Sequence, residues 1–184
     1  MKISQTALET KRLILRAFVL EDAAEVQRLA GDWEVARTTL NIPHPYEDGM
    51  AESWIARQAE NQSNHNFAIT LRATGQLCGC IGLALDEANQ TAEMGYWIGV
   101  PFWNSGFCTE AANALVDYGF STRGLHKIQA RHLGCNEASG RVMQKIGMTL
   151  EGTLRKHVLR HNERHDLVCY GILRSEWERH RVLE

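Results

Sequence analysis

The sequence has few of the features that would place a protein in a membrane or outside the cell. No apolar run approaches the ~20 residues needed to span a bilayer. The first residues, MKISQTALETKR, lack the apolar segment of a signal peptide. We therefore expect a cytoplasmic protein with no membrane partner.

The chain also lacks an excess of charge, since its formal net charge is −2. A protein that binds nucleic acid directly would show a basic excess, so we expect no nucleic-acid partner. The five cysteines form no CxxC pair. Cys78 and Cys80 fall on one face of an expected strand, where we interpret them as buried structural thiols.

The sequence has no internal repeat, no low-complexity segment and no linker that would divide it. With 184 residues, 44% of them hydrophobic, the chain is long enough to bury a substantial core. We expect a single domain over residues 1–184.

Residues 93–112, EMGYWIGVPFWNSGFCTEAA, predict a strand, a short loop and the start of a helix. Met94, Tyr96 and Ile98 alternate with other residues, as in a strand, until Pro101 ends the pattern. The N–H groups of a helix's first turn form a ready site for an anion such as a diphosphate. The motif therefore has the layout of a nucleotide or coenzyme A phosphate site, although a plain strand–loop–helix connection would look the same.

Strands cluster first and then alternate with helices, which indicates an α/β or α+β domain with a mixed sheet. The expected strands cover residues 12–18, 66–71, 76–85, a strand from 93, 127–133, 150–159 and 165–173. The expected helices cover residues 21–30, 48–61, 109–124 and 137–146, and residues 31–47 are expected to form a loop.

Several motifs occur in the order found in one known family. The string GYWIGVPFWNSGFCTEA (95–111) resembles the central motif of the ribosomal-protein N-acetyltransferase branch (RimJ/RimL type) of the GNAT acetyltransferase superfamily. ETKRLILR (9–16) resembles the opening strand of that branch. The strings NEAS (136–139), KIGM (145–148) and EG (151–152) resemble its second block, and YGIL (170–173) with EW (176–177) resembles its closing strand and tail.

The resemblance implies the GNAT fold, a mixed, mostly antiparallel sheet of about seven strands flanked by helices. In that fold the strands starting near Glu93 and Lys127 run parallel and separate, and the pantetheine arm of acetyl-CoA lies in the gap. Acetyl-CoA is thus the implied co-substrate. The implied cofactor contacts are Ile98, Gly99, Val100, Asn104, Gly106, Phe107, Cys108, Thr109, Asn136 and Ser139.

Three of these residues allow a second interpretation. Asn136 and Ser139 alone would be a helix cap and an ordinary surface serine, whereas the family pattern implies an amide that contacts pantetheine and a hydroxyl that acts as general acid toward the leaving thiolate. Cys108 is either a small packing residue or an oxidisable thiol whose thiolate the helix N-terminus favours.

No residue is an obvious general base. Some relatives carry a glutamate at the position that corresponds to Val158, so Glu93 and His157 are the candidate catalytic bases. A lysine amine has a pKa of ~10.4 and a peptide α-amine one of ~7.7–8.0, a gap worth about 3.5 kcal/mol of deprotonation at neutral pH. A weak base would therefore suit a protein N-terminal α-amine.

The resemblance also implies that Trp33, His44 and Tyr46 line the amine mouth. Acetylation of a polyamine, an amino acid or an aminoglycoside stays open as an alternative, as does a non-catalytic acyl-CoA sensor. A homodimer is possible. We expect no metal, because the spacing of His157, His161 and His165 suits zinc only on a helix and the local pattern predicts strand–turn–strand.

Overall fold

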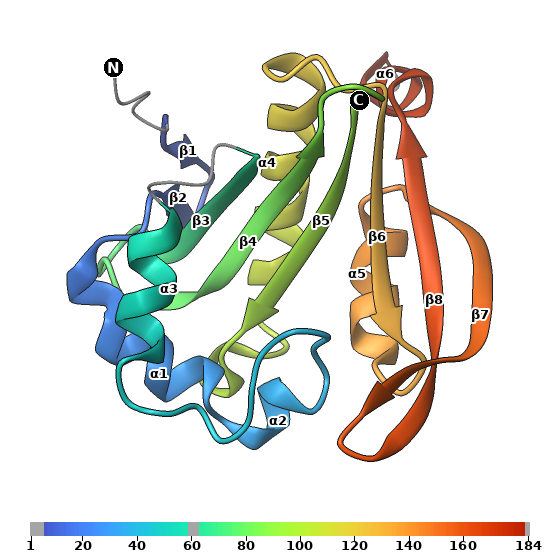
Figure 1. Cartoon of the computed structure of the whole chain (residues 1–184). Helices are drawn as coiled ribbons and strands as arrows, with labels where there is room; N and C mark the ends of the chain where they lie inside the picture. Colours follow the sequence, from blue (N-terminus) through green and yellow to red (C-terminus); the bar gives the residue numbers. More distant parts are fainter. Residues whose placement is uncertain (1–5, 59–62, 183–184) are drawn as a thin grey trace.

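The computed structural model describes residues 6–58 and 63–182. Over that part of the chain, eight strands form one mixed sheet in the order β1-β2-β3-β4-β5-β6-β8-β7 (Figure 1). The strands are β1 (Leu8–Glu9), β2 (Leu13–Arg16), β3 (Asn64–Leu71), β4 (Leu77–Asp86), β5 (Thr91–Ile98), β6 (Lys127–Leu133), β7 (Thr149–Arg160) and β8 (Glu163–Leu173). The α-helices are α1 (Ala23–Ala30), α2 (Trp33–Ala36), α3 (Met50–Gln58), α4 (Phe107–Ser121), α5 (Glu137–Lys145) and α6 (Arg174–Val182), with 3₁₀ turns η1 (Leu20–Asp22) and η2 (Val100–Phe102).

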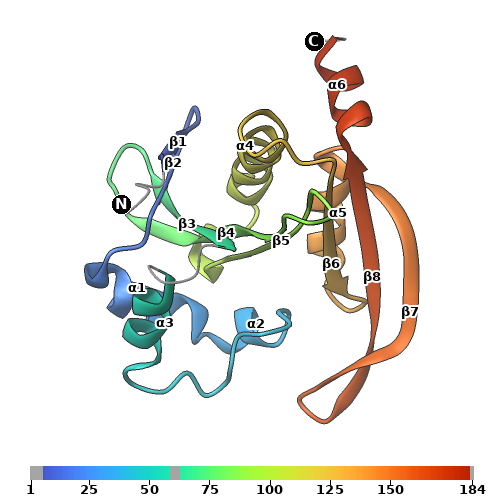
Figure 2. The same cartoon turned by 45° about the horizontal axis from the view of Figure 1, so that its top comes forward.

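The helices cover the two faces of the sheet, with α1, α2 and α3 on one face and α4 and α5 on the other (Figures 1 and 2). The larger core joins the sheet to α4 and includes Phe67, Ile81 and Leu115. A smaller core joins it to α1 and α3 through Val26 and Ile55. Among the described residues, no helix is long and apolar enough to cross a membrane.

One pair of neighbouring strands differs from the others, because β5 and β6 run parallel while the remaining pairs are antiparallel. Their pairing extends only from Thr91 opposite Lys127 to Met94 opposite Ala130. Beyond it, β5 follows β4 as far as Ile98, and β6 follows β8 as far as Leu133. The two strands therefore separate, and Figure 1 shows the gap between them.

Helix α4 packs against this part of the sheet through the stripe that its sequence predicts. Leu115, Val116 and Phe120 are buried. A Cβ at Gly119 would lie 2.7 Å from Ile128 Cδ1, so the missing side chain lets the helix approach β6 closely. This contact fixes the position of the helix that begins at the gap.

Most sequence expectations for the elements are confirmed, and the differences have physical causes. The strand over 127–133 has the expected bounds. Segment 31–47 contains α2, whose four residues are too few to show a helical period; Asp32 caps it by accepting from the Glu34 N–H. β1 adds a two-residue strand, and α6 forms where only a tail was expected. The helix expected over 48–61 runs from Met50 to Gln58, and its last expected residues lie outside the described part.

Candidate active site

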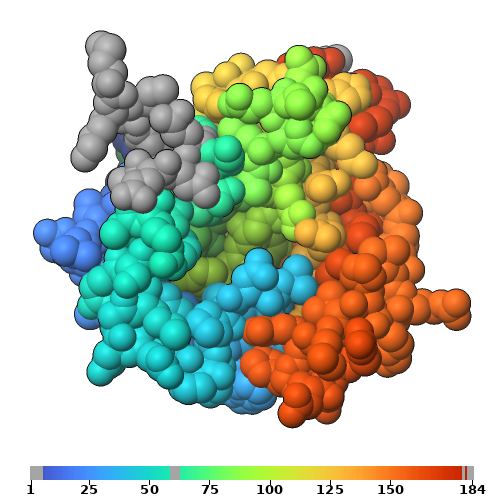
Figure 3. Space-filling view, viewed as in Figure 1, coloured from blue at the N-terminus to red at the C-terminus, as the bar shows by residue number. Residues whose placement is uncertain are grey.

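A cavity of about 790 Å³ opens where β5 and β6 separate. Its lining includes residues from β5, β6, the start of α4, α5 and the segment 35–43. Figure 3 shows the molecule hollowed at the centre of this face, between α3, the 36–46 segment and the β7–β8 hairpin. The cavity therefore reaches both faces of the sheet.

The start of α4 forms one end of the cavity. Gly106, the N-cap, has a left-handed backbone with φ of 76°, which glycine adopts without a steric cost. The first hydrogen bond of the helix runs from the Glu110 N–H to the Gly106 carbonyl at 3.1 Å. The N–H groups of residues 107–109 therefore have no acceptor within the helix. They are directed to where an anion would sit.

Arg12, the residue before β2, holds this loop in place. Its Nη1 donates to the Ser105 carbonyl at 2.9 Å, its Nε donates to Glu110 Oε2 at 2.6 Å, and its guanidinium lies 4.7 Å from the centre of the Phe107 ring. Burial opposes ionisation of Glu110, but hydrogen bonds from Thr10 and Arg12 outweigh it and lower the pKa of this carboxyl. The ion pair therefore stabilises the loop.

Some main-chain groups at the end of β5 already form hydrogen bonds within the protein. The Gly99 N–H donates to the Cys78 carbonyl of β4 at 2.8 Å, so the predicted support of a thioester carbonyl by Gly99 would break a bond of the sheet. Because successive N–H groups of a strand point to opposite edges, that of Ile98 faces the gap. The Ile98 carbonyl accepts from the Trp103 indole at 2.7 Å. Val100, in η2, is not among the described residues that line the cavity.

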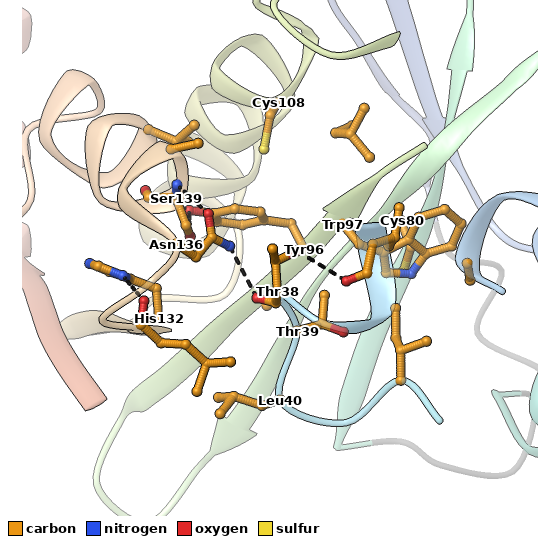
Figure 4. Close-up of a pocket in the computed structure, with 18 of the residues that line it drawn as sticks. Thr38, Thr39, Leu40, Cys80, Tyr96, Trp97, Cys108, His132, Asn136 and Ser139 are labelled. Carbon is orange, nitrogen blue, oxygen red and sulfur yellow. Dashed lines mark hydrogen bonds between the residues drawn. The ribbon is translucent and has the colours of Figure 1, made fainter. Parts of the chain in front are cut away.

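Asn136 and Ser139 lie together at the start of α5 (Figure 4). The Asn136 Oδ1 accepts from the Ser139 N–H at 3.1 Å, and its Nδ2 donates to the Thr38 carbonyl at 3.1 Å. Asn136 is therefore a helix cap that also joins α5 to the segment after α2. The interpretation of Ser139 as a surface serine is wrong, because only 9% of the residue is exposed.

The Ser139 hydroxyl has a partner that sequence reasoning missed. Tyr96 reaches from β5 toward Ser139 (Figure 4), with Oη 2.8 Å from Ser139 Oγ and 3.1 Å from the Ser139 carbonyl oxygen. Burial raises the pKa of Tyr96 well above its usual range. The phenol therefore stays protonated and is a hydrogen-bond donor to Ser139. In the sequence, the alternation along β5 places Tyr96 on one face of the strand, but it does not indicate that Tyr96 contacts Ser139.

Cys108 lines the cavity at the first turn of α4. Burial raises the pKa of this thiol to about 12. Burial therefore opposes the thiolate that a helix N-terminus would favour.

The structure separates the two candidate bases. Glu93 lines the cavity, where Arg131 of β6 binds it with Nη2 at 2.7 and 2.6 Å from the two carboxylate oxygens. His157 is exposed on β7, next to the register shift between Leu154 and Val158. It is not among the described residues that line the cavity. Of the two candidate bases, Glu93 alone is among the described residues that line the cavity.

The predicted amine-mouth residues also separate. Tyr46 is half-buried and lines the cavity. Trp33 packs between His44, with ring centres 5.0 Å apart, and His161 of the β7–β8 turn, at 4.6 Å. Neither Trp33 nor His44 is among the described lining residues. These three rings instead join the segment 33–46 to the β7–β8 hairpin.

Arg160, at the end of β7, strengthens the same connection. Its Nη2 donates to the Ile42 carbonyl at 2.7 Å and to the Ala36 carbonyl at 3.3 Å. No sequence signal could have found these contacts, because the partners are 118 and 124 positions apart. Among the described residues, no three His, Cys, Asp or Glu side chains are grouped to hold a metal ion, and the set His157, His161 and His165 does not form such a group.

Parallel strands that separate beside a helix N-terminus combine a site for an anion with an open strand edge for an extended ligand. Residues 12–149 match the family model described as an acetyltransferase (GNAT) domain. The chain belongs to this GNAT acetyltransferase family and is an acetyl-CoA-dependent N-acetyltransferase.

Individual relatives agree with the family. A solved GNAT-family acetyltransferase from Bacillus anthracis is 30% identical, with a TM-score of 0.83, and the match covers 93% of this chain and 100% of that one. YdaF of Bacillus subtilis, named provisionally as a ribosomal N-acetyltransferase, is 31% identical over 83% of this chain and 82% of its own length. The spermidine N(1)-acetyltransferase of Escherichia coli is 27% identical over 76% of this chain and 74% of its own length.

The residues present fit acetyl-CoA. The pairing of β5 with β6 ends at Met94, which leaves an unpaired strand edge for an extended arm, and the start of α4 offers three consecutive N–H groups to a diphosphate. The place of a Cβ at Gly106 would be 3.4 Å from Arg12 Nη2, so the bare main chain keeps this end open. These features lie at one end of the cavity that also contains Ser139.

Proposed function

We propose that the chain, acting as one domain over residues 1–184, acetylates the N-terminal α-amine of a protein, of the ribosomal-protein type. The amine attacks directly in a complex that contains both substrates. The observation that carries the proposal is the gap between β5 and β6, which joins the start of α4 to Ser139 within one cavity. Acetyl-CoA supplies the acetyl group as a thioester.

Main-chain groups hold the co-substrate in this proposal. The N–H groups of Phe107, Cys108 and Thr109 bind the diphosphate, next to Asn104 and Gly106 in the loop. The Ile98 N–H faces the gap and supports the thioester carbonyl oxygen, where negative charge develops during attack. Asn136 contacts the pantetheine arm after its amide leaves the Thr38 carbonyl.

Ser139 donates a proton to the departing sulfur. Tyr96 donates to the Ser139 carbonyl at 3.1 Å, and its Oη lies 2.8 Å from the serine oxygen. When the serine turns its proton toward the sulfur, the phenol can move its hydrogen bond to the serine oxygen. Glu93 lies on the amine side, where its carboxylate accepts the proton of the attacking amine through water. Arg131 binds both oxygens of this carboxylate through Nη2.

The charges of the cavity favour a peptide over a polyamine. The acidic residues among the described lining are Glu93 and Glu137, and the basic ones are Arg37, Arg131, Arg141 and Lys145. Arg131 already neutralises Glu93. A polyamine carries further ammonium groups that need unpaired carboxylates, whereas a peptide N-terminus carries one reacting amine. Figure 3 shows that the hollow opens at the surface, where a chain end can approach.

A thiol-release assay tests the proposal. We expect free coenzyme A to appear with short peptides, and mass spectrometry to locate the acetyl group on their α-amine. Spermidine, free lysine and an aminoglycoside serve as competing acceptors. Faster turnover with spermidine would contradict the peptide assignment and favour the activity in the name of the Escherichia coli relative. Binding of acetyl-CoA without thiol release for any amine would indicate a sensor.

A further inference from the structure

Gly95 is a glycine in the middle of β5 for which the protein itself gives no reason. Its φ is not in the left-handed region, and a Cβ built on it would have no heavy atom within 4 Å. Glycine inside a strand is destabilising relative to a residue with a side chain. An alanine would therefore fit and would make the strand more stable.

Neighbouring glycines differ, because the protein leaves them no room. A Cβ at Gly79 would meet the Trp97 carbonyl, and one at Gly99 would meet the Leu29 side chain. At Gly82, which pairs with Gly95 across β4 and β5, it would meet the Asn66 side chain. A strand glycine without such a neighbour often marks a place where a ligand comes close to the main chain.

The position of Gly95 indicates which ligand this is. Met94 is the last residue of β5 that pairs with β6, so Gly95 is the first residue at the gap. It is exposed and lines the cavity. Along β5, Tyr96 points to Ser139 on the α5 face, and Gly95 therefore faces the opposite side, with Glu93 and Trp97.

We propose that Gly95 is the specificity-determining position of the amine site. The strand carries no side chain there, so that the first residue of the acceptor lies against the main chain of β5 at the start of the gap. Glu93 and Trp97 bound this place along the strand, and the Asn66 side chain bounds it across β4. This inference rests on the proposed function and adds where the acceptor's first residue lies.

Graded substitutions test the inference. Gly95→Ala and Gly95→Leu add a small and a large side chain at a position without a protein neighbour. We expect kcat/KM for peptides with a bulky first residue to fall about 5-fold and about 100-fold, respectively, since even ~1 Å of misplacement can cost two orders of magnitude. Peptides that begin with glycine should lose less. The dissociation constant of coenzyme A, from calorimetry, should change less than about twofold, because this face is the amine side.

Gly152 provides a matched control. It lies in β7, and a Cβ there would also have no heavy atom within 4 Å, but it is not among the described residues that line the cavity. Gly152→Ala and Gly152→Leu should leave kcat/KM for every peptide unchanged. Thermal melting of all four variants identifies any that fail to fold, and Gly95→Ala keeps the test valid if Gly95→Leu does not fold.

The outcomes separate the inference from the function on which it rests. If the wild type acetylates peptides and both folded Gly95 variants match it on every first residue, the inference is wrong and the proposed function stands. The inference would also be wrong if the Gly95 variants lost as much affinity for coenzyme A as they lose in kcat/KM, because Gly95 would then lie on the cofactor side. If the wild-type protein acetylates no peptide, the proposed function fails and the inference fails with it.

Discussion

The two sides of the cavity are built in different ways. On the proposed cofactor side, one continuous segment, 98–109, provides the end of β5, the loop and the first turn of α4, and the contacts proposed for this segment are mainly main-chain N–H groups. On the amine side, Tyr46, Glu93 and Arg131 come from separate elements, and Arg160 holds the 36–42 segment from far along the chain.

This difference has a chemical basis. A diphosphate and an extended arm are bound by N–H groups that any sequence supplies once the backbone has the right path. An acceptor is recognised by the shape and charge of side chains, and these converge from distant positions. The cofactor side is therefore the part of the site that relatives with different acceptors can share.

The largest expected effect concerns Ser139, where the two sides meet. Ser139→Ala should lower kcat about 1000-fold, within the range of general acid catalysis, with little change in the affinity for coenzyme A. Tyr96→Phe should lower kcat about 10-fold, because the serine proton is then less well directed. Steady-state thiol release measures both.

Ser175→Ala is the control, because Ser175 is exposed at the start of α6. If Ser139→Ala kept the wild-type kcat, Ser139 would not be the general acid.

Gly106 tests the cofactor side alone. Gly106→Val places a branched side chain at φ of 76°, next to the main-chain N–H groups. We expect coenzyme A to bind about 100-fold more weakly, since the loop must leave its left-handed conformation. Calorimetry measures the affinity.

Gly75→Val is a matched variant, with φ of 74° in the turn between β3 and β4. It brings the same backbone strain, of about 1–2 kcal/mol, to a place away from the cavity. Equal affinity for coenzyme A in the two variants would show that the 104–109 loop is not the diphosphate site.

Arg160 tests the amine side alone. Arg160→Met removes the hydrogen bonds to the Ala36 and Ile42 carbonyls, so we expect KM for the amine to rise about 10-fold while coenzyme A affinity stays the same. Arg160→Lys should restore part of the loss. Arg155→Met, at an exposed position of β7, should have no effect. A parallel loss of coenzyme A affinity would show that the two sides are not independent.

The smallest effect is the pH dependence of the Arg12–Glu110 pair. Because the pKa of folded Glu110 lies below its ordinary value, its stabilisation is present above about pH 4.3 and is lost as the pH falls through the folded pKa. Glu110→Gln should melt about 3 °C lower than the wild type at pH 7. This difference in melting temperature should disappear in acid. A difference in melting temperature that stays constant down to pH 3 would contradict this assignment.

The sequence predicted the fold wherever a period or a cap had room to appear. The strand over 127–133 and the Asn136 cap of α5 follow from local pattern. Helix α2 did not, because four residues show no period. The resemblance to the family implied a mixed sheet of about seven strands with one parallel, separating pair, whereas the described residues form eight strands. The strand order was not predicted, since strand pairing depends on contacts between distant residues.

The candidate site shows the same division. The 93–109 motif could be predicted from the sequence because one continuous segment contains the strand, the loop and the start of the helix. Three contacts were not: Tyr96 with Ser139 is 43 positions apart, Glu93 with Arg131 is 38 apart, and Arg160 with Ile42 is 118 apart. A single sequence carries no sign of which distant side chains meet, so the acceptor remained the least predictable part.

A crystal structure of the protein with coenzyme A is the most direct test of how the co-substrate binds. The account predicts diphosphate oxygens at about 3 Å from the N–H groups of residues 107–109, with the sulfur in the gap beside Ser139. A diphosphate bound elsewhere, or an arm that does not enter between β5 and β6, would contradict it.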